Sequence, residues 1–229
     1  MSEAAAGETR ALHALGRAYA RQRYSILFYT LLATMVAAPV FAALNYRGTL
    51  LEFFLAGNLL AAVMPVSAAK GRGILLIMMT LAWLARAAAA WFDHPALSVM
   101  VLGMWTLIGL FTAAGALSFA MRAKSVDAEH LYAALSAYLL AGIFFGLFYW
   151  VLEQIWPGTF AAAGDFSRMS AIYFSFVTAA TLGYGDIVPR TDVARGLTIV
   201  EGVGGQLFLA VMVARLVSLY AQGQPRTKS

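Results

Sequence analysis

The sequence predicts an all-α membrane protein with six transmembrane helices and one re-entrant half-helix per chain. The 229-residue chain is 62% hydrophobic and only 12% charged, and its mean hydropathy of +0.76 is far above that of a soluble domain. Six apolar segments are each long enough to cross a bilayer, which takes about 20 residues. A seventh, residues 169–180, is too short to cross and instead fits a half-helix that enters and leaves the membrane on one side.

The six predicted spans are residues 26–44, 49–67, 73–91, 95–121, 131–154 and 191–220. Cytoplasmic loops carry an excess of Lys and Arg, which sets the orientation of the spans. If the N-terminus is cytoplasmic, the inner side holds most of the basic residues: Arg10, Arg17, Arg21, Arg23, Lys70, Arg72, Arg122, Lys124, Arg226 and Lys228. We therefore expect a multi-pass protein of the cell membrane with both termini cytoplasmic. A cleaved signal peptide over residues 26–44 is the alternative, which the long charged leader disfavours.

The composition disfavours an enzyme. The chain has no cysteine, and its three histidines, His13, His94 and His130, lie in different segments without the spacing of metal ligands. The basic residues lie between apolar segments, so membrane orientation accounts for the net charge of +5 better than nucleic-acid binding does. No cofactor and no catalytic residue are expected, and membrane lipids are the expected surroundings.

The segment that follows the short half-helix, TLGYGD at residues 181–186, has glycine at alternating positions. Gly183 and Gly185 can adopt a positive φ at little cost, whereas the residues between them cannot. Alternation of the two backbone conformations points successive carbonyl oxygens to one side of an extended strand. Because one such strand cannot surround an ion, we expect a homotetramer. Four strands around an axis would form rings of oxygen ligands from Thr181, Leu182, Gly183 and Tyr184, which suit an alkali cation that sheds its water.

The half-helix itself supports a cation site. If it descends from the outer side, its C-terminal end points into the membrane and carries a partial negative charge, which favours a cation. Asp165 or Ser167 is the expected N-cap of this helix.

TLGYGD resembles the selectivity filter of tetrameric potassium channels, with leucine where valine is commonest, and the resemblance extends over about residues 131–220. It implies an outer helix, a pore helix, a filter and an inner helix in that order. By this resemblance K⁺ is the permeant ion, held at Thr181, Leu182, Gly183 and Tyr184, and Gly185 completes the filter. Tyr173 and Phe174 would brace Tyr184 as an aromatic pair, and Asp186 would lie at the outer mouth with Tyr173 as its candidate partner. Val177 stands where some members of the family carry a carboxylate that supports the filter.

Glu201 is a carboxyl group inside an apolar span, where it is costly and therefore a functional candidate. In one interpretation it is buried, hydrogen-bonded to Ser175 or Thr178, and braces the filter from behind. In the other it faces the ion pathway and concentrates cations.

The same span contains Gly202, Gly204 and Gly205 in its outer half. They form either a hinge for gating, since glycine weakens a helix, or a surface for close packing against the pore helix. Val213 and Val217, one turn apart, are candidates for a narrow inner gate.

The chain divides into four predicted parts: a basic cytoplasmic segment (1–25), a four-helix transmembrane region (26–121), a pore module (122–220) and a short cytoplasmic tail (221–229). The first segment is either a helix on the inner leaflet or a solvated tail. Glu52 and Arg86 lie at matching depths and form a predicted structural ion pair, with Asp93 as the alternative partner of Arg86. The fourth span has no charged residue, so the four-helix region is not a charge-carrying voltage sensor.

The sequence therefore predicts a potassium-selective channel that conducts K⁺ passively, with no fused ligand-binding domain. The alternatives are a weakly selective cation channel of the same fold, a transporter-like potassium uptake subunit and a non-conducting subunit that modulates another channel. An uptake subunit of that kind usually carries four pore loops, whereas this chain carries one.

Overall fold

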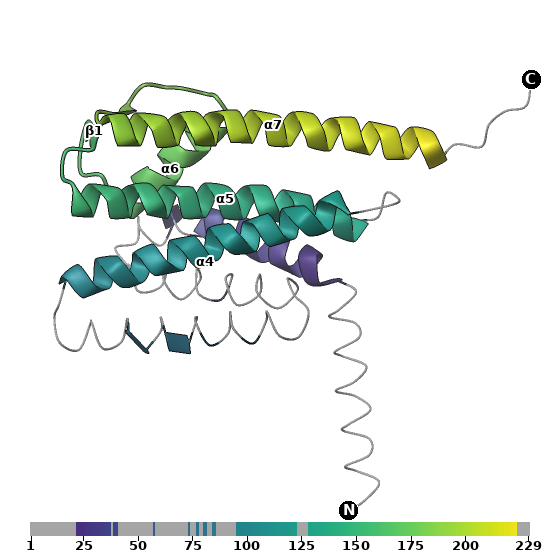
Figure 1. The fold of residues 1–229 in the computed structure, drawn as a ribbon, viewed down its shortest axis with the longest axis horizontal. Helices are drawn as coiled ribbons and strands as arrows, with labels where there is room; N and C mark the ends of the chain where they lie inside the picture. The colour runs from purple at the N-terminus through teal and green to yellow at the C-terminus, as the bar shows by residue number, and fades with distance from the viewer. Residues whose placement is uncertain are drawn as a thin grey trace, which may run out of the picture.

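A computed structural model describes residues 22–37, 39–40, 57, 73, 77, 80–81, 84–85, 95–122 and 128–223 (Figure 1). The predicted ion pair of Glu52 and Arg86 lies outside these residues, as does Asp93. Most of the predicted spans 49–67 and 73–91 lies outside them too, so these two spans stay predictions.

Three long helices dominate the described part of the chain: α4 (Pro95–Met121), α5 (Ala128–Ile155) and α7 (Asp192–Gly223). In Figure 1, α5 runs between α4 and α7, and α7 extends beyond it toward the C-terminus. All three helices are long and apolar enough to cross a membrane.

The helix bounds differ from the predicted spans mostly at the ends. Helix α4 coincides with the predicted span 95–121, whereas α5 begins at Ala128 rather than at residue 131. Helix α7 continues to Gly223, so the first residues of the predicted tail, 221–223, are helical. Residues 22–25, predicted as cytoplasmic, already belong to the first described helix, residues 22–37.

Glu129, in the first turn of α5, holds the helix of residues 22–37. Its two carboxylate oxygens accept hydrogen bonds from the backbone N–H of Tyr24, at 3.1 Å, and from the Ser25 hydroxyl, at 2.8 Å. A carboxylate in the first turn of α5 is also favoured by the dipole of that helix. The contact joins segments about one hundred residues apart in the sequence.

Helix α6 (Arg168–Ala179) is the predicted half-helix, shifted by one residue from 169–180. Of the two expected caps, Ser167 is the one used: its hydroxyl accepts a hydrogen bond from the backbone N–H of Ser170 at 3.2 Å. Helix α6 packs on α5 because glycine leaves room for its backbone. A Cβ at Gly146 would overlap the backbone of Ile172, and one at Gly142 would overlap the ring of Phe176.

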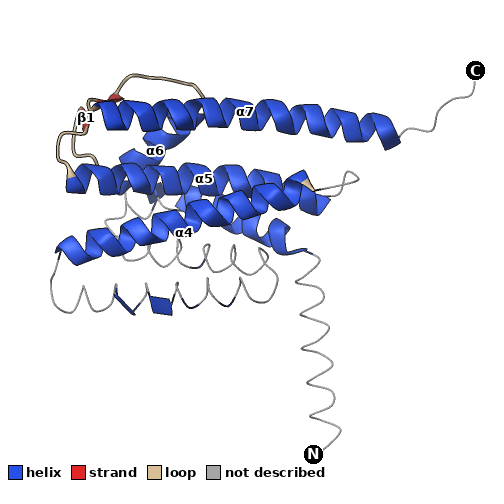
Figure 2. Cartoon of the chain, in the orientation of Figure 1, coloured by secondary structure: helices blue, strands red, loops and turns tan. Residues whose placement is uncertain are grey.

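Two short strands, which the all-α prediction did not include, join the loops at one end of the helices (Figure 2). Strand β1 (Phe160–Ala162) pairs antiparallel with β2 (Ile187–Pro189), with Phe160 opposite Pro189. Glu153 at the end of α5 fixes the turn that leads into β1, since its carboxylate accepts the backbone N–H groups of Gly158 at 2.8 Å and Phe160 at 2.9 Å. The pairing ties the loop before α6 to the loop after residues 181–186.

Candidate functional site

The loop of residues 181–186 leaves the C-terminal end of α6 and leads into β2. Its first amides turn back onto the helix: Thr181 N–H donates to the Thr178 carbonyl at 3.0 Å, and Leu182 N–H donates to the Val177 carbonyl at 2.9 Å. In a trans peptide the carbonyl points opposite to the following N–H. The Thr181 carbonyl therefore points away from α6.

Positive φ angles alternate along this loop, at Thr181 (56°), Gly183 (57°) and Gly185 (80°). The two glycines adopt the conformation expected from the sequence, but Thr181 was not expected to share it. A β-branched residue at positive φ is a strained outlier, which costs about 1–3 kcal/mol and persists only where the surroundings impose it. The alternation of positive φ therefore begins at Thr181, two residues before the first of the two glycines.

The side chains of the loop are open in the single chain. The apolar side chain of Leu182 is 57% exposed, and the aromatic side chain of Tyr184 is 66% exposed. Both side chains are therefore accessible to the surroundings of a single chain.

Tyr173 on α6 supports the loop at Tyr184 and Asp186. The rings of Tyr173 and Tyr184 are parallel, with centroids 6.4 Å apart. Desolvation of its hydroxyl, a hydrogen bond to the Asp186 carboxylate and the negative charge of that carboxylate raise the pKa of Tyr173 above its ordinary value. Asp186 is the partner that the sequence suggested for Tyr173.

Phe174, in contrast, does not lie against Tyr184 within the chain. It is buried among the outer aromatic cluster, which we define as Tyr149, Phe160, Phe166 and Phe174. Its ring meets those of Tyr149 and Phe160 at centroid distances of 5.4 Å and 5.5 Å. Within one chain Tyr173 contacts Tyr184, and Phe174 fills the core behind the loop, because α6 turns the two adjacent side chains to different faces. The support of Tyr184 by Phe174 stays a prediction.

Glu201 on α7 is 5% exposed and joins three helices. Its Oε2 accepts a hydrogen bond from the Tyr149 hydroxyl of α5 at 2.6 Å, and its Oε1 is hydrogen-bonded to the Ser175 hydroxyl of α6. Ser175 is one of the two partners that the sequence suggested, and Thr178 is not used. Tyr149 was missed, since an aromatic residue in an apolar helix gives no signal that its hydroxyl faces a carboxyl group 52 residues away.

The hydrogen atoms of this network can be counted. Ser175 has one hydroxyl proton but two acceptors within reach, Oε1 of Glu201 and the Gly142 carbonyl at 2.7 Å. If Glu201 is protonated on Oε1, it donates to Ser175, Ser175 donates to Gly142, and every donor has one acceptor. A glutamine amide at this position could make the same bonds. The hydrogen bonds of Glu201 thus favour the interpretation in which it braces the filter over the one in which its charge faces the ion pathway.

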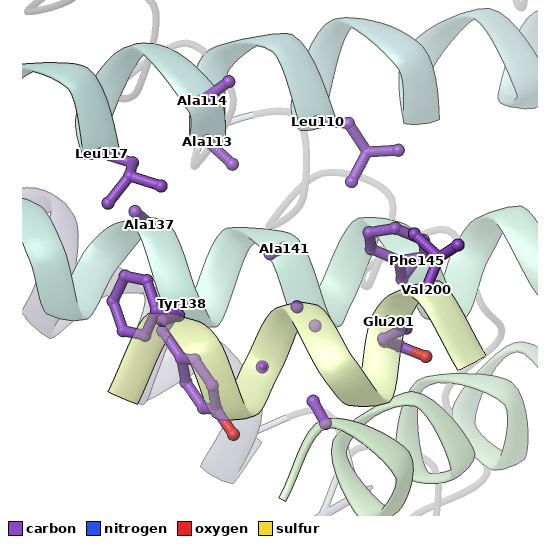
Figure 3. A pocket seen from close by; sticks show the side chains of 15 residues that line it. Leu110, Ala113, Ala114, Leu117, Ala137, Tyr138, Ala141, Phe145, Val200 and Glu201 are labelled. Atoms are coloured by element: carbon purple, nitrogen blue, oxygen red, sulfur yellow. The ribbon is translucent and has the colours of Figure 1, made fainter. Parts of the chain in front are cut away.

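A cavity of about 380 Å³ lies beside Glu201, between α4, α5 and α7 (Figure 3). Leu117 and Tyr138 lie at one end of the cavity, and Phe145, Val200 and Glu201 lie at the other. Its lining is almost wholly apolar, and no cluster of three or more His, Asp or Glu side chains that could hold a metal occurs among the described residues.

The three glycines of α7 differ in their surroundings. A Cβ at Gly205 would lie 2.5 Å from the Ala179 carbonyl oxygen at the end of α6, which real Cβ atoms do not tolerate. A Cβ at Gly202 would make an ordinary contact with Thr178 at 3.7 Å, and one at Gly204 would meet nothing within 4 Å. Gly205 therefore allows α7 to pack closely on the C-terminal end of α6, next to the start of the loop.

A matched pair of alanine variants separates packing from hinge motion. Gly205→Ala is expected to destabilise the protein by about 1–3 kcal/mol through overpacking, whereas Gly204→Ala should leave stability unchanged or raise it slightly because alanine favours helix. Thermal unfolding of the purified variants, followed by circular dichroism, measures the difference. Both alanines restrict the backbone equally, so equal effects of the two on stability and function would support the hinge instead.

We define the open face of α7 as Ile199, Gln206, Val213 and Val217. These residues are seven or four positions apart and so share one side of the helix, and the structure leaves all of them exposed in the single chain. Gln206 is the polar member. Its Nε2 lies 3.4 Å from the Thr181 Oγ1, a hydrogen bond that the sequence did not suggest.

The region from α5 through α6 and the loop to α7 is similar to known proteins. Residues 134–222 match the Ion channel family. The matched segment takes in most of α5, all of α6, the loop of residues 181–186 and nearly all of α7, and it leaves out α4. Together with the three apolar helices, this match indicates a membrane protein whose residues 134–222 are similar to an ion-channel family.

Two curated relatives are similar to part of the chain. The chain is 50% identical over 50 residues to two-pore potassium channel 4 of Arabidopsis thaliana. This match covers 22% of this chain and 18% of the relative. It is 41% identical over 51 residues to probable potassium channel protein 2 of Methanocaldococcus jannaschii, covering 21% of this chain and 15% of the relative. The match thus spans less than a fifth of either relative. No solved structure matches the chain.

Proposed function

We propose that the protein is a potassium-selective channel, in which K⁺ moves passively through a fourfold filter formed by Thr181, Leu182, Gly183, Tyr184 and Gly185. One observation carries this proposal: positive φ alternates at residues 181, 183 and 185 while the Leu182 amide is bonded back to α6. The bond of the Leu182 amide turns the Thr181 carbonyl away from α6, and a continued alternation would aim the following carbonyl oxygens to the same side. Oxygen rings of that kind replace the water around an alkali cation.

The proposal requires four copies of the chain, since one loop supplies a quarter of each ring. The exposed side chains of Leu182 and Tyr184 and the apolar open face of α7 support assembly about a central axis. In the tetramer these surfaces would face the other copies and the ion pathway. Val213 and Val217, on the open face, are then the candidates for an inner gate.

The remaining assignments follow the sequence. We propose six spans per chain in the cell membrane, with both termini cytoplasmic, and a pore module at residues 122–220 preceded by a four-helix region at 26–121. Helix α4 carries no charged residue, so this region would move little charge in the membrane field. Tyr173 and Asp186 would secure the outer mouth, and Glu201 would brace the filter from behind.

Reconstitution of the purified protein in liposomes tests the function. In a K⁺ gradient we expect K⁺ flux that collapses when Na⁺ replaces K⁺, and bi-ionic reversal potentials that favour K⁺ strongly. Conduction with little preference would indicate the weakly selective channel. Absence of flux from a tetramer of the protein alone would contradict the proposal and favour a modulatory subunit.

A further inference from the structure

The contact between Gln206 and Thr181 joins the inner helix to the first residue of the loop. Gln206 is a polar side chain on the otherwise apolar open face of α7, and its amide reaches the Thr181 hydroxyl at 3.4 Å. A buried or membrane-embedded amide is costly unless its hydrogen bonds are satisfied. An amide has two N–H donors and an acceptor oxygen, and this bond uses one donor, so most of the group is left open on the side away from α6.

The bond has a consequence for the Thr181 oxygen. A hydroxyl oxygen has two lone pairs and one proton. When one lone pair accepts from Gln206, this contact favours one side-chain rotamer of Thr181, and the second lone pair is left for another partner. The backbone of Thr181 is already held at a strained φ of 56°, and a β-branched side chain has few χ1 rotamers. The position of Oγ1 is therefore set jointly by the backbone and by Gln206.

We propose that Gln206 is a positioning residue for a cation site at the inner end of the filter. Resting on the proposed channel function, this inference adds a residue outside TLGYGD to the ion pathway. In the tetramer four Gln206 amides form a ring below the filter and turn four Thr181 hydroxyl oxygens toward a single cation. The carbonyl rings above Thr181 do not depend on Gln206, so selectivity between K⁺ and Na⁺ is retained when Gln206 is changed.

The test measures cation affinity at the inner site with Ba²⁺, which is close to K⁺ in size and carries twice the charge. Gln206→Met keeps the length of the side chain and removes its hydrogen bonds. Loss of one hydrogen bond is worth about 1 kcal/mol, so Ba²⁺ applied from the inner side should inhibit K⁺ flux with roughly five- to tenfold lower affinity. Leu207→Met, one position along α7 and not in contact with Thr181, is the control and should leave inhibition unchanged.

A double-mutant cycle shows whether Gln206 acts through Thr181. Thr181→Val keeps the shape of the side chain and removes Oγ1, so it should weaken Ba²⁺ inhibition by itself. Gln206→Met should then add no further loss in the Thr181→Val background. Equal losses in both backgrounds, or no loss from Gln206→Met in the otherwise unchanged protein, would overturn the proposal.

Calorimetric titration of the same proteins with Ba²⁺ keeps the result independent of conduction. If the unchanged protein conducts K⁺ and its Ba²⁺ affinity is insensitive to Gln206, the proposed function stands and this inference fails. If the unchanged protein does not conduct but its Ba²⁺ affinity falls in Gln206→Met, the inner site stands and the channel function fails. Size-exclusion chromatography verifies assembly, and Gln206→Leu replaces Gln206→Met if the latter does not form tetramers.

Discussion

Gly183→Ala is expected to abolish K⁺ selectivity while leaving the helices intact. Gly183 has a φ of 57°, and a Cβ there would meet no atom within 4 Å, so the effect comes from the backbone conformation and not from overlap. An L-residue at positive φ costs about 1–2 kcal/mol, and the variant carries this cost four times in one pore. Rotation of the peptide relieves the strain, but it turns a ring of carbonyl oxygens away from the ion.

The matched control is Gly158→Ala. Gly158 has a φ of 86° and is likewise surrounded by open space, but it lies in the turn after α5, before β1. The Gly158→Ala variant should have a similar backbone strain and should leave K⁺ selectivity unchanged. Reversal potentials in K⁺ and Na⁺ measure the difference. A Gly183→Ala tetramer that keeps the unchanged protein's preference for K⁺ would show that residues 181–185 are not the filter.

Glu201→Leu is expected to cause the largest loss of stability, together with loss of K⁺ flux, whereas Glu201→Gln should behave nearly as the unchanged protein. Leucine leaves the Tyr149 hydroxyl without its acceptor and breaks the link through Ser175 between α7 and α6. Each buried polar group left without a partner costs about 1–3 kcal/mol. Glutamine can donate to Ser175 and accept from Tyr149, so the three helices stay joined.

Thermal unfolding and liposome flux of both variants provide the measurement, with Tyr149→Phe as an intermediate case that removes one of the two bonds. The glutamine variant distinguishes the two roles of Glu201. If Glu201→Gln folds normally but its conductance falls steeply, the negative charge itself acts on the permeant ion, and the brace is the wrong explanation.

Properties that depend on a residue's own chemistry were predictable from the sequence. Helix α4 matches the predicted span at both ends because an uninterrupted apolar segment begins at Pro95 and ends before Arg122. The positive φ of Gly183 and Gly185 follows from their missing Cβ. Glu201 was recognised because a carboxyl group among apolar residues requires a partner wherever the helix lies.

Properties that depend on which segments meet were decided by the tertiary structure. The partner of Glu201 on α5, Tyr149, is 52 residues away. Helical periodicity does not predict which residue the Tyr149 hydroxyl contacts. Strands β1 and β2 are three residues each, too short for an alternating pattern, and exist because each supplies the other's hydrogen bonds. Thr181 shows the division most clearly. Its intrinsic preference is for negative φ, but the backbone amides of Thr181 and Leu182 are both bonded to carbonyls at the end of α6. These two bonds hold Thr181 at 56° against that preference.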